Sequence, residues 1–469
     1  MKPKKGQELT VKIDRLVFGG EGIASIDGFK LFIPSTAPGD EALVEVRKVR
    51  SSYGEGKVLE LVKPSPLRIE SRCKHADICG GCKWQFLPYE EQLKIKEQQV
   101  KDSVHRLGGL SEDLVLPIVG NESPWFYRNK MELSFGRSTN PNSSEEGTAM
   151  LGFFPPGFHY EVFDVEECFL QSELLAELVK KVRDFAHEKK ISVFNSHTGE
   201  GVLKSLIIRE GKNTNEVMLI LVTSADLFDK VEDFKALFAD DARITSLYWN
   251  SVIQIPGQPT WTEEKLLAGK PTLMEALILE NGHRLEFDIL PQAFFQTNTK
   301  QAQVLYSKVV ELAELSGGEV VYDLYCGTGT IGLFCAHKAK QVIGIEVNES
   351  AVDSARSNAQ KNGITNAHFY LGSVEERLKS LETHPEFSKP DVLIVDPPRA
   401  GLGEKVVVDC VAFGAKKIVY VSCNPTTLAR DLKQFAELGY KTVSVQPVDM
   451  FPQTHHVECV SLLQFSVVS

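Results

Sequence analysis

A cysteine, a carboxylate and an acidic-proline loop in the last third of the chain have the residue types needed for covalent catalysis. Cys423 follows an apolar, strand-like run in the motif Ser422-Cys-Asn-Pro425, and Asp396-Pro-Pro-Arg399 ends an earlier run of the same kind. Glu458 lies in a polar turn before another apolar run. A thiolate can add to an electron-poor carbon, and a carboxylate can remove a proton. Taken alone, Cys423 is more often a small buried hydrophobe and Glu458 a surface carboxylate.

A glycine-rich loop earlier in the chain has the pattern of a nucleotide-binding turn. The pattern G-x-G-x-x-G is formed by Gly327, Gly329 and Gly332. It follows an apolar strand, and Glu346 ends the next strand about twenty residues later, where an acidic side chain can bind ribose hydroxyls. NAD and S-adenosyl-L-methionine (SAM) both fit this pattern, and glycines that serve only a tight turn are a third interpretation. Asp323, late in the first strand, and the later Asp-Pro-Pro loop favour the methyl donor, because a methyltransferase uses such a loop to line the boundary between donor and acceptor.

The cofactor loop, the cysteine and the carboxylate together predict methyl transfer through a covalent adduct. C5 of a pyrimidine is too weakly nucleophilic in the intact ring to be methylated directly. A thiolate that adds to C6 converts C4–C5 into an enolate, and C5 can then attack a methyl sulfonium. A base must afterwards remove the C5 proton. We therefore expect Cys423 to be the nucleophile and Glu458 the base, at the same end of a sheet.

Five motifs of the last third occur in the order of the RNA uracil-5 methyltransferase family, which the chain resembles. They are Phe294-Phe-Gln-x-Asn298, the loop from Asp323 to Gly332, Asp396-Pro-Pro-Arg399, Ser422-Cys-Asn-Pro425 and Met450-Phe-Pro-x-Thr-x-His-Val-Glu458. The resemblance implies an α/β, class I SAM-dependent methyltransferase domain of Rossmann-like fold, with Cys423 as nucleophile and Glu458 as base. It also implies donor contacts at Gln296, Tyr325, Thr330, Glu346 and Asp396. A further donor contact, often Asp or Asn in the family, falls on Ser373, which departs from that pattern.

Four other cysteines have a spacing that suggests a metal site. The compact motif Cys73-x5-Cys79-Gly-Gly-Cys82 is followed much later by Cys168. Such a set can hold an iron–sulphur cluster or complete a tetrahedral zinc site, although structural zinc more often uses two paired knuckles. The pattern also resembles the cluster-bearing branch of the same family. We therefore expect a 4Fe–4S cluster on Cys73, Cys79, Cys82 and Cys168, with zinc or free cysteines as the alternatives.

The N-terminal segment has the sequence pattern of a small β-barrel. Short strand-like runs at 9–13, 31–33 and 42–46 are separated by Gly-Gly, Asp-Gly and Pro-Gly turns. The sequence from Ile13 to Asp40 resembles the TRAM domain, a five-stranded OB-type barrel found on RNA-modifying enzymes. Such barrels bind single strands through a basic groove, and a protein-contact module is the alternative. A basic stripe could be formed by Arg47, Lys48, Arg50 and Lys57, although these residues fit a solvated strand face equally well.

The length of 469 residues predicts two or three domains. We expect a TRAM-like, RNA-binding barrel over residues 1–63, a mixed α+β central domain with the cluster site over 64–285, and the methyltransferase domain over 286–469. In the central domain a helix is predicted at 89–107, strands at 203–209 and 216–222, and a polar loop at 138–148.

Composition and charge exclude several classes of protein. The net charge of −11 argues against a globally basic nucleic-acid binder, but it leaves room for a local basic stripe. The N-terminus lacks the apolar core of a signal peptide, and the longest apolar runs are much shorter than a membrane span. Nine cysteines in such a chain do not have the density of a disulfide scaffold. We expect a cytoplasmic monomer with no membrane attachment and no obligate protein partner.

The predicted function is SAM-dependent formation of 5-methyluridine in structured RNA. 23S ribosomal RNA is the expected substrate, because the tRNA-specific bacterial branch of the family usually lacks both barrel and cluster; tRNA is the alternative, because some cluster-bearing relatives act on it. Two other classes compete: an NAD-dependent oxidoreductase and a catalytically dead RNA-binding adaptor. Transfer of label from a methyl-labelled donor indicates the methyltransferase, whereas reduction of NAD indicates the oxidoreductase. A wild-type protein with no turnover at all would favour the adaptor.

Overall fold

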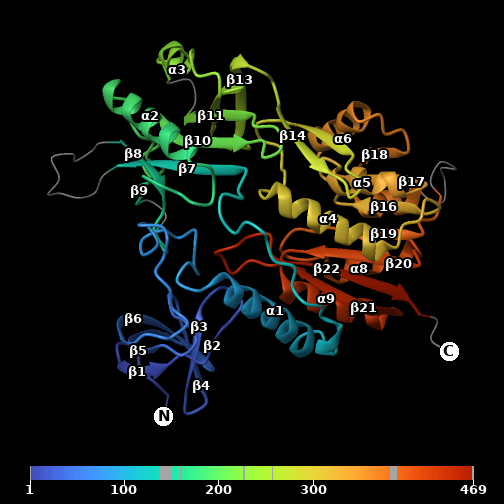
Figure 1. Ribbon diagram of the computed structural model, residues 1–469, viewed down its shortest axis with the longest axis horizontal. Helices are drawn as coiled ribbons and strands as arrows, with labels where there is room; N and C mark the ends of the chain where they lie inside the picture. Colours follow the sequence, from blue (N-terminus) through green and yellow to red (C-terminus); the bar gives the residue numbers. More distant parts are fainter. Residues whose placement is uncertain are drawn as a thin grey trace.

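The structure is a computed structural model that describes residues 2–137, 149–158, 161–224, 228–255, 257–380 and 388–466. These residues form three large sheets and a two-stranded hairpin, which follow one another from blue to red in Figure 1. The polar loop predicted at 138–148 lies outside the described residues. Across the described ranges, no helix combines the length and the apolar character that crossing a membrane requires.

The N-terminal barrel is a six-stranded sheet that curls around its own apolar core. Its strands lie in the order β1-β5-β6-β4-β3-β2. They are β1 (Glu8–Lys12), β2 (Arg15–Leu16), β3 (Gly22–Ile26), β4 (Phe29–Ile33), β5 (Glu41–Val49) and β6 (Tyr53–Lys63). Ala42, Val44 and Val46 alternate along β5 and are fully buried, as expected for a strand with one face on the core. The three predicted runs lie on β1, β4 and β5, and the two-residue β2 adds one strand to the five implied by the resemblance.

The barrel shares a second apolar cluster with the segment that follows it. Leu16 and Ala37 of the barrel pack with Trp84 and Leu87. Trp84 is fully buried, and its indole N–H donates to the carbonyl of Gly20 at 3.3 Å. The barrel is therefore tied to the rest of the molecule by a common core.

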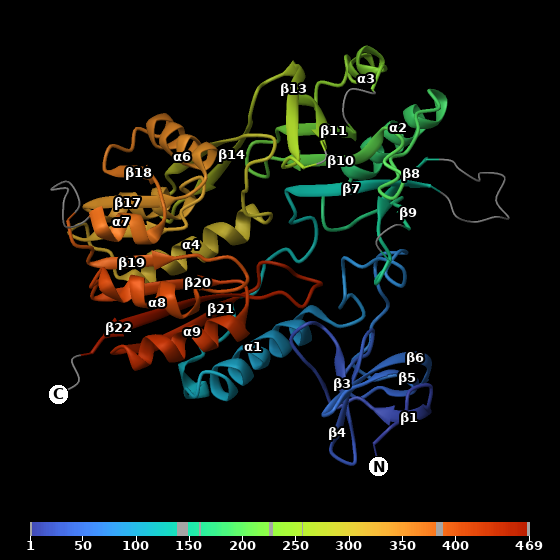
Figure 2. The ribbon, with the colours of Figure 1, turned by 180° about the vertical axis from the view of Figure 1, so that it is seen from behind.

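Helix α1 (Tyr89–Arg106) confirms the helix predicted at 89–107. It lies between the barrel and the C-terminal sheet in both views (Figure 1 and Figure 2) and packs on helix α9 (Pro425–Glu437). Residues from the two ends of the sequence thus meet along this helix.

The central part is built on a seven-stranded sheet in the order β13-β12-β11-β10-β7-β8-β9. The strands are β7 (Lys130–Arg137), β8 (Ala149–Phe153), β9 (Phe163–Asp164), β10 (Leu203–Glu210), β11 (Val217–Ser224), β12 (Ser246–Ile253) and β13 (Trp261–Gly269). Helices α2 (Leu174–Glu188) and α3 (Val231–Leu237) share one apolar core with this sheet, and a 3-10 turn, η1 (Glu112–Leu114), precedes it in the chain. The predicted strands at 203–209 and 216–222 are confirmed as β10 and β11.

A hairpin of β14 (Leu273–Ile278) and β15 (Arg284–Ile289) connects the central sheet to the C-terminal part. Residue 285, where the central domain is predicted to end, lies inside β15. The division into three domains with these boundaries stays a prediction.

The C-terminal part is a seven-stranded sheet in the order β18-β17-β16-β19-β20-β22-β21. Its strands are β16 (Val320–Leu324), β17 (Gln341–Glu346), β18 (Ala367–Leu371), β19 (Val392–Val395), β20 (Lys417–Ser422), β21 (Tyr440–Val448) and β22 (Glu458–Phe465). The other helices are α4 (Thr299–Ala313), α5 (Thr330–Cys335), η2 (Ala336–Lys338), α6 (Glu349–Lys361), α7 (Val374–Ser380) and α8 (Gly403–Ala412). The strands from β18 to β20 are parallel, and β22 runs antiparallel to its two neighbours.

Both faces of this sheet are covered by apolar cores. Along β19, for example, Leu393 and Val395 belong to one core and Val392 and Ile394 to the other. Strands buried on both faces are typical of parallel sheets with crossover helices. The predicted α/β class is confirmed.

Candidate active site

The chemistry-bearing residues gather at one edge of the C-terminal sheet, where its parallel strands end. Tyr325 follows β16, Glu346 ends β17, Asp396 follows β19 and Cys423 follows β20. Because β22 is antiparallel to β20, its first residue, Glu458, lies at the same edge. Open α/β sheets bind their ligands outside the carboxyl ends of the strands, which is the edge occupied here.

A cavity of about 980 Å³ lies over this edge. Its walls include Gln296, Tyr325, Glu346, Asp396, Cys423 and Glu458. Small-molecule pockets span about 300–1,000 Å³, and this cavity is at the upper end of that range. It therefore leaves room next to a nucleotide cofactor for a second ligand against Cys423.

The pairing of β20 with β22 brings Cys423 and Glu458 together. Ser422, the last residue of β20, is the register partner of Cys459. Cys423 and Glu458 are the next residues outward from that pair on the two antiparallel strands. Cys423 is half-buried, whereas Glu458 is 5% exposed. The expectation that both residues lie at the same sheet end is confirmed.

The start of α9 fixes the Cys423 loop against the Asp-Pro-Pro loop. Asn424 caps the helix, and its Oδ1 accepts the N–H of Thr426 at 3.0 Å. The Nδ2 of Asn424 and the hydroxyl of Thr427 donate to the carbonyl of Arg399 at 3.2 and 3.3 Å. Asparagine at the N-cap followed by proline at the first helical position is a favoured helix start. The residues after Cys423 therefore determine where its side chain stands.

Burial and neighbouring carboxylates disfavour the thiolate of Cys423. Burial raises the pKa of Cys423 to about 11, and Glu458 and Asp396 add to the rise. The Arg399 guanidinium lowers this pKa by its charge and by a hydrogen bond to the sulfur. At neutral pH the thiol of the free protein is protonated, and Arg399 is the cation that favours its ionisation.

Two carboxyls of the same wall are also held toward the protonated form. Burial raises the pKa of Glu458 well above its usual range, Asp396 raises it further, and Arg399 lowers it. Burial raises the pKa of Asp396 to about 7. Asp396 lines the cavity and is only half-buried, so water there limits this rise. A positively charged ligand beside Asp396 would favour its ionised form.

The glycine loop presents open backbone to the cavity. Gly327 has φ 52°, and a Cβ there would have no atom within 4 Å. Gly329 has φ 79°, and a Cβ there would stand 2.8–2.9 Å from Phe369 and Ala355. The second glycine is therefore required by packing, while the first, which lines the cavity, lets a ligand approach the main chain.

Glu346 is fixed in the cavity wall by main-chain donors. Its Oε2 accepts from the N–H of Gly327 at 3.1 Å, and its Oε1 accepts from those of Val347 and Asn348 at 2.8 and 2.9 Å. Tyr325, in the same wall, has a positive φ of 64°, a conformation that non-glycine residues adopt mainly at strained or functional positions. Both residues are thus held in place before any ligand binds.

The sequence matches two family models and has full-length relatives. Residues 2–59 match the TRAM domain, and residues 253–466 match tRNA (uracil-5-)-methyltransferase. The chain is 37% identical to an uncharacterized RNA methyltransferase of Clostridium tetani, over 98% of this chain and 97% of the relative. It is 39% identical to another uncharacterized RNA methyltransferase, of Bacteroides thetaiotaomicron, over 95% of this chain and 99% of the relative. The chain belongs to the RNA uracil-5 methyltransferase family.

A solved structure resembles this methyltransferase over nearly its whole length. The tRNA (uracil-54, C5)-methyltransferase of Pyrococcus abyssi, in complex with S-adenosyl-L-homocysteine, superposes with a TM-score of 0.74 at 31% identity. The match covers 97% of this chain and 100% of that one. The C-terminal sheet thus has the SAM-dependent methyltransferase fold, and the N-terminal barrel is a TRAM domain. Because the family is one of methyltransferases, a dehydrogenase does not explain the glycine loop.

Thr330, a predicted donor contact of this methyltransferase, is not among the residues that line the main cavity. It begins α5, and its hydroxyl lies 3.3 Å from that of the buried Tyr306 on α4. The structure therefore shows a contact between the two helices at this position.

Ser373 faces a smaller cavity of about 190 Å³, which shares Tyr325 and Glu346 with the main one. Its N–H donates to the carboxylate of Glu376 at 2.8 Å, and its Oγ accepts the N–H of Glu376 at 3.2 Å. This reciprocal pair is a capping box at the start of α7. Ser373 thus has a structural role, which is to cap α7.

Several side chains that line the cavity were not predicted as site residues, among them Arg399, Phe451 and Glu264. Arg399 and Phe451 stand inside motifs that were recognised, so their position in those motifs was the available signal. Glu264 lies on β13 of the central sheet, far from any motif, and reaches the cavity only through the fold. No local pattern in the sequence marks it.

The four predicted cluster cysteines line one cavity of about 260 Å³ beside the central sheet: Cys73, Cys79, Cys82 and Cys168. Burial raises the pKa of all four thiols, that of Cys82 to about 12. Within the described ranges, no three His, Cys, Asp or Glu side chains are grouped so that they could hold a metal ion. The four cysteines therefore share one cavity.

The predicted basic stripe lies on the β5–β6 hairpin of the TRAM barrel. Arg47 pairs with Glu45 at 2.9 Å, and Lys48 pairs with Glu55 at 2.7 Å. These acidic neighbours weaken the local positive potential, because each cancels one cation of the stripe.

Proposed function

We propose that this methyltransferase transfers a methyl group from SAM to C5 of a uridine in structured RNA, through a covalent adduct between Cys423 and C6 of the base. The observation that carries the proposal is the composition of the 980 Å³ cavity. One wall offers a nucleotide-binding glycine loop, and another offers a thiol beside a buried carboxylate.

The residues of the glycine-loop wall fit the methyl donor. Gly327 exposes main chain, and Glu346 is oriented toward a ribose-binding position by its main-chain donors. Asp396 supplies negative charge at the boundary between this wall and Cys423. SAM, when bound, supplies an electrophilic methyl group on a positively charged sulfonium. We propose that Gln296, Tyr325, Glu346 and Asp396 hold it, with further contacts at Thr330 and Ser373, which also fix the helices α5 and α7 beside it.

Cys423 starts the reaction on the uracil ring. Its thiol loses a proton to water, with Arg399 stabilising the thiolate, and the sulfur bonds to C6 while the C5–C6 electron pair moves toward C4 and its oxygen. The enolate formed in this way makes C5 the nucleophile that takes up the methyl group, and S-adenosyl-L-homocysteine is the leaving group. Cys423 stays bonded to C6 until the ring has lost the proton at C5.

Glu458 completes the reaction as the base. Its carboxylate takes the C5 proton, the C5–C6 double bond reforms, and the sulfur leaves as a thiolate. Burial beside Asp396 raises the pKa of Glu458, which makes its carboxylate a stronger base than an exposed one.

We also propose that Cys73, Cys79, Cys82 and Cys168 hold a 4Fe–4S cluster. Four thiols around one cavity are donors that either an iron–sulphur cluster or zinc accepts. The spacing Cys73-x5-Cys79-Gly-Gly-Cys82 with the remote Cys168, which resembles the cluster-bearing branch of the family, favours the cluster. The N–H of Gly81 donates to the sulfur of Cys79 at 3.4 Å, and such bonds tune iron–sulphur sites.

For the RNA substrate we propose 23S ribosomal RNA, with tRNA as the second candidate. The TRAM domain and the four-cysteine cavity support the ribosomal substrate by their likeness to the cluster-bearing branch. The Pyrococcus abyssi relative is a tRNA enzyme that matches nearly the whole chain, and this favours tRNA. Mapping 5-methyluridine in both RNA pools of a deletion strain decides between them, because only the true substrate loses the modification.

Trapping the adduct tests the proposed chemistry. RNA containing 5-fluorouridine, incubated with SAM, should give an RNA–protein adduct that survives denaturation, because the fluorine at C5 cannot leave as a proton. Cys423→Ala should give neither adduct nor product, whereas Cys410→Ala, a buried cysteine on α8, should behave as wild type. An adduct in Cys423→Ala would place the nucleophile elsewhere.

A further inference from the structure

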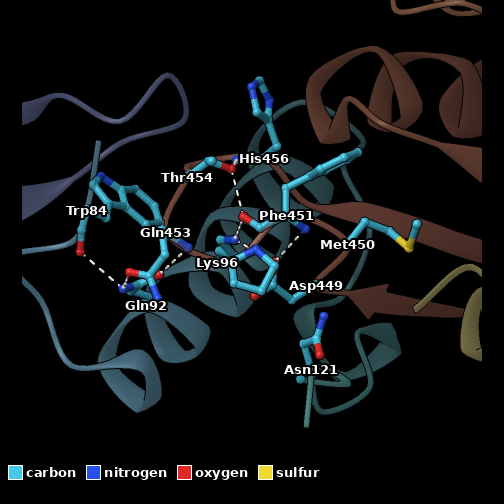
Figure 3. Close-up of polar contacts among 12 residues, drawn as sticks. Trp84, Gln92, Lys96, Asn121, Asp449, Met450, Phe451, Gln453, Thr454 and His456 are labelled. Carbon is cyan, nitrogen blue, oxygen red and sulfur yellow. Dashed lines mark hydrogen bonds and ion pairs between the residues drawn. The ribbon is translucent and has the colours of Figure 1, made fainter. Parts of the chain in front are cut away.

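The loop between β21 and β22 carries two parts of the candidate active site. Phe451, near its start, lines the cavity with Cys423, and the loop ends directly at Glu458. Figure 3 shows that this loop lies on α1 and is held there by polar side chains. Helix α1 contributes no residue to the wall of the main cavity. It can therefore affect the reaction only by way of the loop that it holds.

One anchor of the loop is a fully buried ion pair. The ammonium of Lys96, on α1, lies 2.6 Å from Oδ1 of Asp449, and both side chains are 0% exposed. The same ammonium donates to the carbonyl of Phe451 at 3.1 Å, and the N–H of Phe451 donates to Oδ1 of Asp449 at 3.1 Å. The hydroxyl of Tyr89 donates to the other carboxylate oxygen at 2.8 Å. Lys96 thus binds both the base of the loop and the main chain of the residue that enters the cavity.

A second anchor lies one helical turn earlier on α1. The side-chain amide of Gln92 exchanges hydrogen bonds with Gln453: its Oε1 accepts the N–H at 2.9 Å, and its Nε2 donates to the side-chain oxygen at 2.9 Å. Gln453 has a positive φ of 69°, which is costly for a residue with a side chain. The Nε2 of Gln92 also donates to the carbonyls of Trp84 and Leu87 at 3.0 Å. These contacts hold the main chain of the loop in this conformation at Gln453.

The cost of this arrangement indicates that it serves more than stability. Burial lowers the pKa of Lys96, although the charge of Asp449 opposes the shift. Buried ion pairs are often no more stabilising than apolar residues of the same volume, and their best-attested use is to define one geometry among several. The geometry defined here is that of Phe451 in the cavity wall that also contains Cys423.

We propose that Lys96 is a positioning residue for methyl transfer, which holds Phe451 against the target base. The inference rests on the proposed function. The ring of Phe451 offers an apolar face in the cavity, and aromatic faces are the usual surfaces on which unstacked RNA bases are held. The fixed Phe451 carbonyl and the charge pair set where that face stands.

The test separates positioning from stability with two variants of the pair and one matched control. Lys96→Met leaves a buried carboxylate, whereas Lys96→Met/Asp449→Asn removes both charges and keeps an acceptor for Tyr89. Val100→Ala, on the same helix but facing the core under the C-terminal sheet, lowers stability without touching the loop. For each protein we would measure the melting temperature, SAM affinity, RNA affinity and the single-turnover rate of 5-methyluridine formation.

The double variant should recover most of the melting temperature lost by Lys96→Met and bind SAM as wild type does. Its single-turnover rate should remain lower by about 10²-fold, the typical effect of a displacement near 1 Å in an active site. Val100→Ala should keep a rate near that of wild type. A double variant that regains the rate together with its stability, or a Val100→Ala rate that falls as far, would overturn the inference. Wild type that binds SAM and RNA but forms no 5-methyluridine would instead overturn the proposed function, and this inference with it.

Discussion

Replacing Arg399 by Gln should make the thiol of Cys423 less acidic and slow every reaction of its thiolate. Burial raises the pKa of this thiol to about 11 even with the guanidinium in place. At pH 8 only about one molecule in 10³ is then ionised, because each pKa unit is a factor of ten. An adjacent cation lowers a pKa by about 1–3 units. Since Arg399 is exposed to water, the lower end applies, and Arg399→Gln should reduce the thiolate fraction about tenfold.

The assay is alkylation of Cys423 in the free enzyme by iodoacetamide between pH 7 and 10, followed by mass spectrometry of the peptide that contains it. No RNA is needed, so effects on substrate binding do not enter. The logarithm of the wild-type alkylation rate should rise with pH at a slope near one over this range. The line for Arg399→Gln should run parallel to it, about one logarithmic unit lower. Arg399→Lys, which keeps the charge and loses the planar geometry, should fall between them.

Arg430 provides the matched control. It lies on α9, and its guanidinium donates to the carbonyl of Ala400 at 2.9 Å and pairs with Asp431 at 2.7 Å. Arg430→Gln removes the same charge from a neighbouring position without a contact to the sulfur, and its profile should coincide with that of wild type. Superposable profiles of wild type and Arg399→Gln would refute the role given to Arg399. A wild-type plateau near pH 8 would refute the elevated pKa.

Three further outcomes are expected. Glu458→Gln should accumulate the methylated covalent adduct and turn over slowly, because an amide cannot take the C5 proton; turnover at the wild-type rate would show that another group is the base. Cys79→Ser should remove iron, acid-labile sulphide and the brown colour of anaerobically purified enzyme, whereas stoichiometric zinc without sulphide in wild type would contradict the cluster. Burial and repulsion from Asp396 raise the pKa of Asp323 to about 8, so protonation of this carboxyl stabilises the fold below about pH 4, and that contribution is lost as the pH rises to 8. Urea unfolding should therefore show a smaller loss of stability between pH 5 and 8 for Asp323→Asn than for wild type, and equal losses would be inconsistent with a shifted pKa.

The sequence predicted the sheet edge well because its signals are local. Glycines, acidic strand ends and the Asp-Pro-Pro loop each follow a strand directly, and parallel strands place their carboxyl ends along one edge. The meeting of Cys423 and Glu458 followed in the same way from strands that end or begin beside them. Helix α1 was predicted from apolar periodicity, and strands β10 and β11 were predicted from runs rich in β-branched residues.

The sequence did not predict which residues from distant parts of the chain the fold brings together. Glu264 reaches the cavity from β13 of another sheet. The motifs do not show that Thr330 contacts Tyr306 or that Ser373 caps α7, and the donor contacts predicted at these two residues stay predictions. Lys96 and Asp449 are separated by 353 positions in the chain, and each alone reads as an ordinary surface charge. Only packing of α1 beside β21 makes them a buried pair.

The position of the TRAM barrel changes how its role must be tested. From the sequence, deleting residues 1–62 should weaken RNA binding with a shallower salt dependence and leave donor affinity almost unchanged. In the fold that deletion would expose Trp84, whose carbonyl accepts from Gln92, and Gln92 in turn holds Gln453 in the loop before Glu458. A truncated protein could thus lose catalysis without any loss of RNA contacts. Arg50 and Lys57 are exposed on the barrel surface, and replacing both by neutral residues leaves this core intact. Only the RNA affinity and its dependence on salt concentration should then change.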